Sequence, residues 1–111
     1  MNATDQTPRL LYVTCGDADE AMCIGHALVA ERLAACTNML DRMRSLYWWD
    51  DAVQEGREAV LIVKTRADRV EAAMALIRQM HSYTVPCIIE LPVGRGNLDY
   101  FGWIAAEAAP R

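Results

Sequence analysis

Two sets of side chains alternate along residues 43–49, which is the period of a β-strand. One set is Met43, Ser45, Tyr47 and Trp49, and the other is Arg44, Leu46 and Trp48. Residues 60–63 (VLIV) form a short apolar, mainly β-branched run, as expected of a strand buried on both faces. These patterns predict one long β-hairpin over residues 34–66, with its turn near Asp50 and Asp51.

The predicted hairpin is long for a small domain. Each arm has about 15 residues and spans roughly 50 Å, whereas a typical strand has about 5–6 residues. The tip carries Tyr47, Trp48 and Trp49, and large aromatic side chains are costly to leave in water. A small domain cannot cover such arms with its own helices, so we expect neighbouring copies of the chain to cover the tips.

The first part of the chain predicts a strand followed by a helix. Residues 9–15 (RLLYVTC) are mostly apolar and indicate a central strand, which Gly16 ends. Asp17 is a favourable N-cap, with Glu20 three residues later, for a helix that extends to about Leu33. Its apolar side chains form two rows: Ala21, Ile24 and Leu28, and Met22, Val29 and Leu33.

After the hairpin, Asp68 and Glu71 repeat the capping arrangement at the start of a second helix. Its apolar stripe is Val70, Ala73, Met74, Ile77 and Met80. The helix ends before Pro86, because a residue before proline avoids helical geometry. Residues 87–93 (CIIELPV) predict a strand, in which Pro92 indicates an edge or a bulge. A turn at residues 94–97 then leads to a short last helix over residues 98–106.

The predicted order is β-α-β-β-α-β-α, and its first six elements match the ferredoxin-like arrangement of an α+β fold. We expect a disordered tail over residues 1–8, one domain over residues 9–107 and a C-terminal tail over residues 108–111. Both main helices should cover the same face of the sheet, which leaves the opposite face open. That face also needs a partner, although periodicity alone does not distinguish a trimer from a dimer.

Composition and charge exclude some classes of binding partner. The chain has 111 residues and a net charge of −4, with a pI near 5.0. This acidic balance argues against nucleic acid and against an anionic membrane surface as partners. No apolar run approaches the roughly 20 residues of a membrane span, and residues 1–9 lack the apolar core of a signal peptide. We therefore expect a cytoplasmic protein.

Six motifs, in this order, are distinctive together. They are ERLAAC (residues 31–36), RSLYWW (44–49), LIVKTR (61–66), HSYTVP (81–86), IIELPV (88–93) and GNLDYFGWI (96–104). With them the chain resembles the CutA divalent-cation-tolerance family over nearly its whole length. The resemblance implies a tight cytoplasmic homotrimer, similar in architecture to the trimeric PII signalling proteins, with a role in tolerance to copper and other divalent ions. It leaves the molecular activity open.

The chain departs from the family pattern at three places. Asp50 and Asp51 stand where the family has Glu-Gly, and aspartate tolerates positive φ better than most residues. Thr84 and Cys87 replace two acidic residues, which removes carboxylates from any cation site there. Gly16 stands where the family commonly has proline.

A soft-metal site is the first chemical hypothesis, because copper(I) prefers thiolate and imidazole ligands. Cys36 and His81 match the cysteine and histidine of the family motifs, Cys87 is an added thiol, and Cys15 is a further candidate. No cysteine spacing matches a zinc site. The alternatives are burial in the core, which we favour for Cys15 and Cys23, and stabilisation of His81 by the helix dipole.

Six aromatic residues form a second candidate site or a subunit interface, where Trp and Tyr are enriched. They are Tyr47, Trp48, Trp49, Tyr83, Tyr100 and Trp103. Lys64 and Arg66 resemble a phosphate-binding pair, but no Gly-rich loop accompanies them, and Arg66 is more simply a surface charge. No nucleophile with a neighbouring base is recognisable, so the sequence does not indicate an enzyme.

The resulting hypothesis is a cytoplasmic homotrimer that confers divalent-cation or copper tolerance by metal binding or sensing, without turnover. Thiols and His81 would supply the ligands, with weak contacts from acidic residues such as Glu90 and Asp99. No cofactor is required, apart from a bound copper or other divalent ion. The alternative is a PII-like signalling or scaffold trimer that binds a small metabolite or a partner protein between its subunits.

Overall fold

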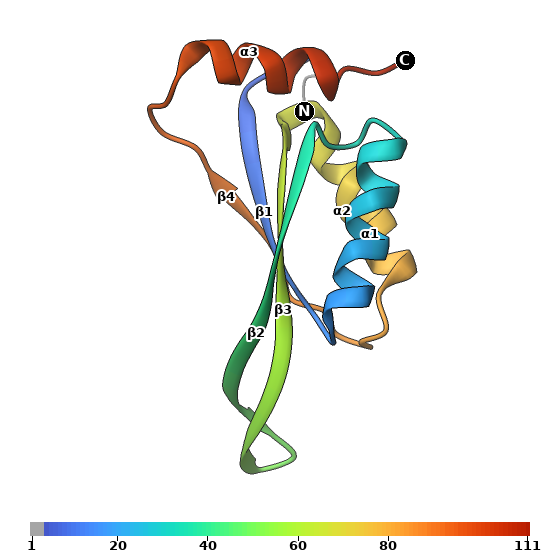
Figure 1. Cartoon of the computed structure of the whole chain (residues 1–111), viewed down its shortest axis with the longest axis vertical. Helices are drawn as coiled ribbons and strands as arrows, with labels where there is room; N and C mark the ends of the chain where they lie inside the picture. Colours follow the sequence, from blue (N-terminus) through green and yellow to red (C-terminus); the bar gives the residue numbers. More distant parts are fainter. Residues whose placement is uncertain (1–3) are drawn as a thin grey trace.

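The computed structural model describes residues 4–111 as a four-stranded sheet, with two helices on one face and a third across one end (Figure 1). The elements are β1 (Pro8–Cys15), α1 (Ala18–Ala30), β2 (Cys36–Trp49), β3 (Ala52–Arg66), a 3-10 turn (Ala67–Arg69), α2 (Val70–Met80), β4 (Ile88–Pro92) and α3 (Leu98–Glu107). The strands lie in the order β2-β3-β1-β4, and every neighbouring pair is antiparallel. The predicted α+β class and order of elements are confirmed, and Pro92 does lie on an edge strand.

The long hairpin is also confirmed. Strands β2 and β3 have 14 and 15 residues and are joined by Asp50 and Asp51 alone. The φ angles of these two residues are 54° and 57°, as a two-residue turn of type I′ requires. In Figure 1 the tip extends well beyond α1 and α2, so neither helix covers it.

A β-bulge in β2 determines which side chains share a face at the tip. Leu40 pairs with Val60 and Met43 pairs with Glu58, so two residues of β2 lie opposite one residue of β3. Arg42, within the bulge, has a φ of 63°. Because the bulge adds one residue, Tyr47 and the other odd-numbered residues after it lie on the same face as Glu58.

The core lies between the sheet and the two main helices. Its largest fully buried side chains include Leu11, Val13, Ile24, Leu28, Leu61, Val63 and Ile77. Helix α1 ends at Ala30 and not at Leu33, since Arg32 adopts a φ of 59° that no α-helix continues. In the second apolar row predicted for α1, Met22 and Val29 are exposed, whereas Leu33 packs against the core.

The opposite face of the sheet is covered by neither α1 nor α2 (Figure 1). Ile62 of β3, Tyr12 of β1 and Ile89 of β4 lie side by side on this face. Ile89 is 50% exposed. The face predicted to lack a cover within the chain is thus open and apolar in the protomer. Within residues 4–111, no helix is long and apolar enough to cross a membrane.

The start of α2 differs from its prediction. Asp68 does not cap the helix, whose N-terminus has no side-chain cap. Instead, the Asp68 carboxylate accepts two hydrogen bonds of 2.8 Å from Arg66, because the 3-10 turn places Asp68 beside that residue. Arg66 is therefore buried and not a surface charge. Its Nη1 donates to the Ala105 carbonyl at 2.9 Å, which attaches α3 to the sheet.

Residues of both predicted tails make contacts with the rest of the domain. The prediction for residues 1–3 lies outside the described residues. The carbonyls of Asp5 and Thr7 accept hydrogen bonds from the backbone N–H groups of Asp68 and Ala67. At the other end, Ala108 is fully buried against Ile104 and Ala35.

The turn residues provide a test of the hairpin geometry. Replacing Asp51 by glycine should raise the free energy of unfolding by about 0.5–1 kcal/mol, because glycine adopts positive φ without steric cost. The temperature of half-unfolding, measured at one protomer concentration, should rise. The matched control is Asp41→Gly, at a position of β2 without positive φ, and it should lower this temperature. A destabilised Asp51→Gly variant would contradict the assigned turn.

Candidate functional site

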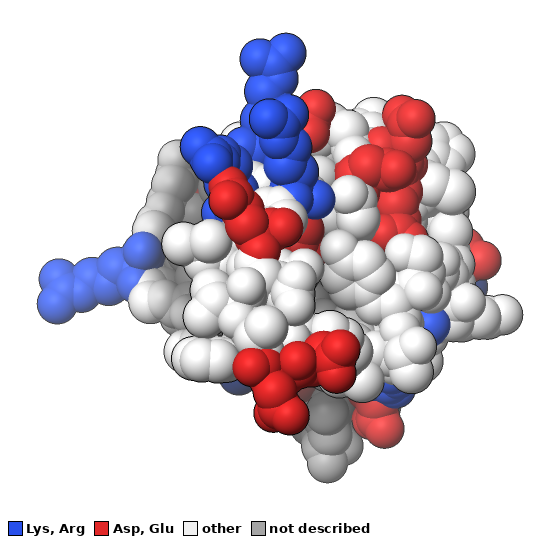
Figure 2. Space-filling model, turned by 90° about the horizontal axis from the view of Figure 1, so that it is seen from below, with Lys and Arg blue, Asp and Glu red and all other residues white. Residues whose placement is uncertain are grey.

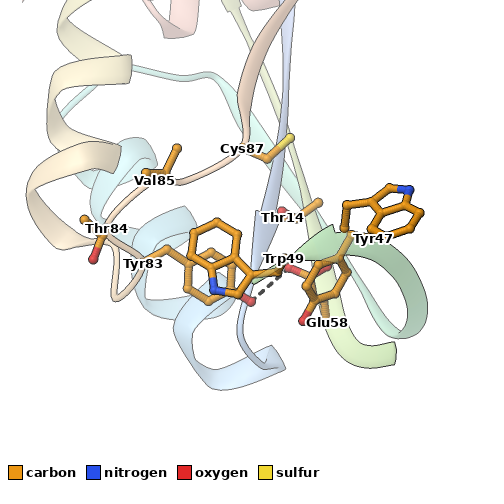
Figure 3. A pocket seen from close by; sticks show the side chains of 9 residues that line it. Thr14, Tyr47, Trp49, Glu58, Tyr83, Thr84, Val85 and Cys87 are labelled. Atoms are coloured by element: carbon orange, nitrogen blue, oxygen red, sulfur yellow. Dashed lines mark hydrogen bonds between the residues drawn. The ribbon is translucent and has the colours of Figure 1, made fainter. Parts of the chain in front are cut away.

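Aromatic side chains at the hairpin tip line an open pocket of about 490 Å³ (Figure 3). Tyr47, Trp48 and Trp49 come from β2, and Glu58 comes from β3. The connection that follows α2 supplies the other side of the pocket, and the end of β1 contributes one residue. The remaining lining residues are Thr14, Tyr83, Thr84, Val85 and Cys87.

Within the described part of the chain, Glu58 is the only charged residue that lines this pocket. Its Oε1 accepts a 2.6 Å hydrogen bond from Ser45 Oγ, and its Oε2 accepts a 2.9 Å hydrogen bond from the Tyr83 hydroxyl. Burial raises the pKa of Tyr83, and the hydrogen bond to Glu58 raises it further, so the hydroxyl keeps its proton and donates. No salt bridge to Glu58 forms within residues 4–111.

One of the two glycines beside the aromatic rings makes room for a ring. A Cβ at Gly16 would lie 3.5 Å from the Tyr83 ring, which is an ordinary van der Waals contact. A Cβ at Gly56 would lie 3.2 Å from the Tyr47 hydroxyl, closer than side chains usually tolerate. The small residue at position 56 therefore allows the Tyr47 ring to lie over β3 beside Glu58.

A second constellation lies behind the first, at the end of β1. One potential ligand atom each of Cys15, Glu20 and His81 lies within 4.8 Å of the other two. Glu20 was predicted only as a partner of the Asp17 cap, and Asp17 does accept from the Glu20 N–H at 2.8 Å. No sequence spacing marked Glu20 as a ligand, because its approach to His81 depends on how α1 and α2 pack.

Hydrogen bonds already occupy most of these atoms. The Glu20 carboxylate accepts from the N–H groups of Gly16 and Ser82, both at 2.8 Å. His81 Nδ1 accepts from the Tyr83 N–H at 3.0 Å. His81 Nε2 therefore carries the proton and donates to the Thr14 carbonyl at 2.7 Å.

The charges around Cys15 favour a cation. Burial raises the pKa of the Cys15 thiol to about 12, with further contributions from the negative charges of Glu20, Asp17 and Glu58. Burial also acts to raise the pKa of Glu20, but hydrogen bonds from Ser82 and Gly16 and the neighbouring His81 lower it overall. The thiol is thus protonated beside an ionised carboxylate, and a metal ion would have to displace its proton.

The four predicted metal ligands do not form one site. Cys15 and His81 lie together, but Cys36 and Cys87 are not part of their cluster. Cys36 begins β2 opposite Lys64 on the open face, and Cys87 lines the aromatic pocket. Cys23 is exposed, which contradicts the prediction that it is buried.

The six predicted aromatic residues divide into two groups. Tyr47, Trp48, Trp49 and Tyr83 surround the pocket. Tyr100 and Trp103 stack on α3 with ring centroids 5.5 Å apart, at the other end of the sheet (Figure 1). The Lys64 ammonium lies 3.3 Å from the Tyr100 hydroxyl, and Asp68 already holds Arg66, so these two cations do not form a free phosphate site.

The remaining surface charges are dispersed. In the view of Figure 2, which faces the hairpin end, acidic side chains form several separate groups and basic ones gather mainly at one edge. The acidic residues named from the sequence are not gathered at either site. Glu90 forms a salt bridge with Arg9 at 3.0 Å, and Asp99 lies in the first turn of α3.

Comparison with known proteins identifies a family. The family profile described as "CutA1 divalent ion tolerance protein" matches residues 9–107. The chain is 37% identical over 95 residues to the divalent-cation tolerance protein CutA of Thermus thermophilus, and this match covers 86% of the chain and 92% of the relative. It is 36% identical over 95 residues to the chloroplastic protein CutA 1 of Oryza sativa, covering 86% of the chain but only 54% of that longer relative.

Solved structures agree. The periplasmic divalent cation tolerance protein CutA of Archaeoglobus fulgidus is 32% identical in sequence, with a TM-score of 0.89. That match covers 93% of this chain and 100% of the other. The arrangement of helices and strands is therefore shared with proteins of this name.

Burial predicts a clear order of thiol reactivity. Native protein treated with iodoacetamide near neutral pH should be alkylated first at Cys23, which is exposed, and last at Cys15, which is fully buried and protonated. Mass spectrometry of peptides at successive times measures both rates, and protein unfolded in denaturant should show similar rates at the two positions. Equal rates in the native protein would contradict the burial of Cys15.

Proposed function

Because the chain belongs to the CutA1 divalent ion tolerance family, we propose that it acts in tolerance to copper and other divalent ions by binding or sensing metal, without catalysis. The observation that carries this proposal is the approach of Cys15, Glu20 and His81 to within 4.8 Å of one another. A thiolate and an imidazole suit copper, and the carboxylate extends the set to harder divalent ions.

Metal binding at this cluster would displace a proton and a hydrogen bond. A metal ion at the cluster must displace the Cys15 proton and one hydrogen-bond partner of His81, either the Tyr83 N–H at Nδ1 or the Thr14 carbonyl at Nε2. Protons therefore compete with the metal, and affinity should fall as pH falls. The negative charges of Glu20, Asp17 and Glu58 around the thiol favour a cation once the proton has left.

We further propose that the protein is a cytoplasmic homotrimer with ferredoxin-like topology and PII-like architecture. Support for assembly comes from large apolar side chains left in water by the protomer: Leu46 is 74% exposed, Trp48 75% and Trp49 63%. Patches of this kind mark association surfaces. Support for the cytoplasm is that all four cysteines are free thiols, the form that a reducing compartment maintains.

The second candidate function is a signalling or scaffold trimer that binds a small metabolite or a partner protein. The aromatic pocket around Glu58 is the observation that favours it. A role for Cys15 as a catalytic nucleophile is not supported, since its thiol is fully buried and its pKa is raised to about 12.

The metal hypothesis is tested by copper(I) titration of the reduced protein against a chelator of known affinity. Cys15→Ser, Glu20→Gln and His81→Gln should each weaken binding by more than the roughly 10–100-fold that loss of an outer-shell partner costs. The matched controls, Cys36→Ser and Cys87→Ser, should bind as the parent does, because neither residue belongs to the cluster. Light scattering must show the same assembly for all variants.

Two outcomes would contradict this assignment. Loss of binding only in the Cys36→Ser or Cys87→Ser variant would move the metal to another part of the sheet. No binding beyond that of the chelator would remove metal coordination as the activity and leave the signalling or scaffold function.

The proposed trimer is tested by dilution. Trp49→Ala should shift assembly toward monomers at protomer concentrations where the parent stays assembled, because it removes an exposed aromatic side chain from the hairpin tip. The control is Arg78→Ala, at an exposed position of α2. Sedimentation that finds both variants equally assembled would show that the tip is not part of the interface.

A further inference from the structure

We propose that the aromatic pocket at the hairpin tip binds a small methylated ammonium cation, with Glu58 as its counter-charge. This inference does not depend on the metal site, because Cys15, Glu20 and His81 do not line the pocket. The volume of about 490 Å³ is within the range of small-molecule sites.

The carboxylate of Glu58 favours a cation as the ligand of this pocket. Among residues 4–111, Glu58 is the only charged residue that lines it, and no lysine or arginine does. The Glu58 oxygens accept hydrogen bonds from Ser45 and Tyr83, and neither of these donors carries a positive charge. A partly buried carboxylate without a salt bridge within residues 4–111 is a binding site for positive charge.

The aromatic side chains select the kind of cation. Tyr47, Trp49 and Tyr83 present three rings on the side of the carboxylate, whereas Trp48 lies on the other face of β2 and lines only the rim. Ring faces attract cations through their quadrupoles. Aromatic cages of this composition suit methylated ammonium groups, which are large and weakly hydrated. A divalent metal ion would need several oxygen ligands, whereas each Glu58 oxygen already accepts a hydrogen bond.

The backbone supports the cage as a built site. Gly56 admits the Tyr47 ring over β3, and the hydrogen bond from Tyr83 to Glu58 fixes the facing wall (Figure 3). The β-bulge places Tyr47, Trp49 and Glu58 on one face of the hairpin. These features position the rings without requiring any ligand to be present.

The experiment titrates the full-length protein with choline and follows tryptophan fluorescence and heat. Its neutral isostere, in which carbon replaces the ammonium nitrogen, is titrated in parallel. Choline should bind, and the isostere should bind at least about threefold more weakly, since it lacks the cation–π attraction. Tyr47→Leu should weaken choline binding by about three- to tenfold, and Glu58→Gln by about fivefold, with light scattering showing that both variants assemble as the parent does.

The matched control is Glu55→Gln, which removes a carboxylate from the other face of β3, where Glu55 pairs with Arg44. It should leave choline affinity unchanged. Equal affinity for choline and its isostere would show a merely apolar pocket and overturn the proposal. No choline binding by the folded parent would overturn it as well, and would indicate that a neighbouring subunit fills the pocket. Neither result bears on copper(I) affinity, so the two proposals fail separately.

Discussion

The antiparallel pairing of β2 with β3 along their whole length is the interaction on which the rest of this structure depends. Strand β3 also pairs with β1, so one arm of the hairpin is central in the sheet while the other forms its edge. The two-residue turn at Asp50 and Asp51 and the bulge at Arg42 fix the register. A shift of one residue in the pairing of β2 with β3 would move Tyr47 and Trp49 to the face opposite Glu58, and the pocket would no longer form.

Both candidate sites arise where β1 ends and the hairpin continues beyond it. The cluster of Cys15, Glu20 and His81 lies among β1 and the ends of the two helices, and the aromatic pocket lies toward the hairpin tip. Tyr83 links them, since its N–H donates to His81 Nδ1 and its hydroxyl donates to Glu58.

The overall architecture was predictable because it rests on local patterns. Alternation predicted the hairpin, the apolar stripe predicted α2, and Asp50-Asp51 predicted the turn, since each depends on residues close in sequence. The errors arose where a local rule met a tertiary contact. Asp68 lies at a sequence position typical of a helix cap, but its carboxylate binds Arg66 instead. Arg66 was predicted to be a surface charge, but in the folded chain it is buried and donates a hydrogen bond to the Ala105 carbonyl of α3.

The candidate sites also show which features follow from sequence and which follow from tertiary packing. Composition and motifs were sufficient to name the family, two of the cluster's three residues and the aromatic tip. Which of these residues meet was decided by packing. Glu20 joins His81 across 61 residues of chain because α1 and α2 lie on the same face of the sheet, and Cys36 is excluded because it begins β2 on the opposite face. Periodicity reports the direction of a side chain from its own element, but distances between elements exist only once the chain has folded.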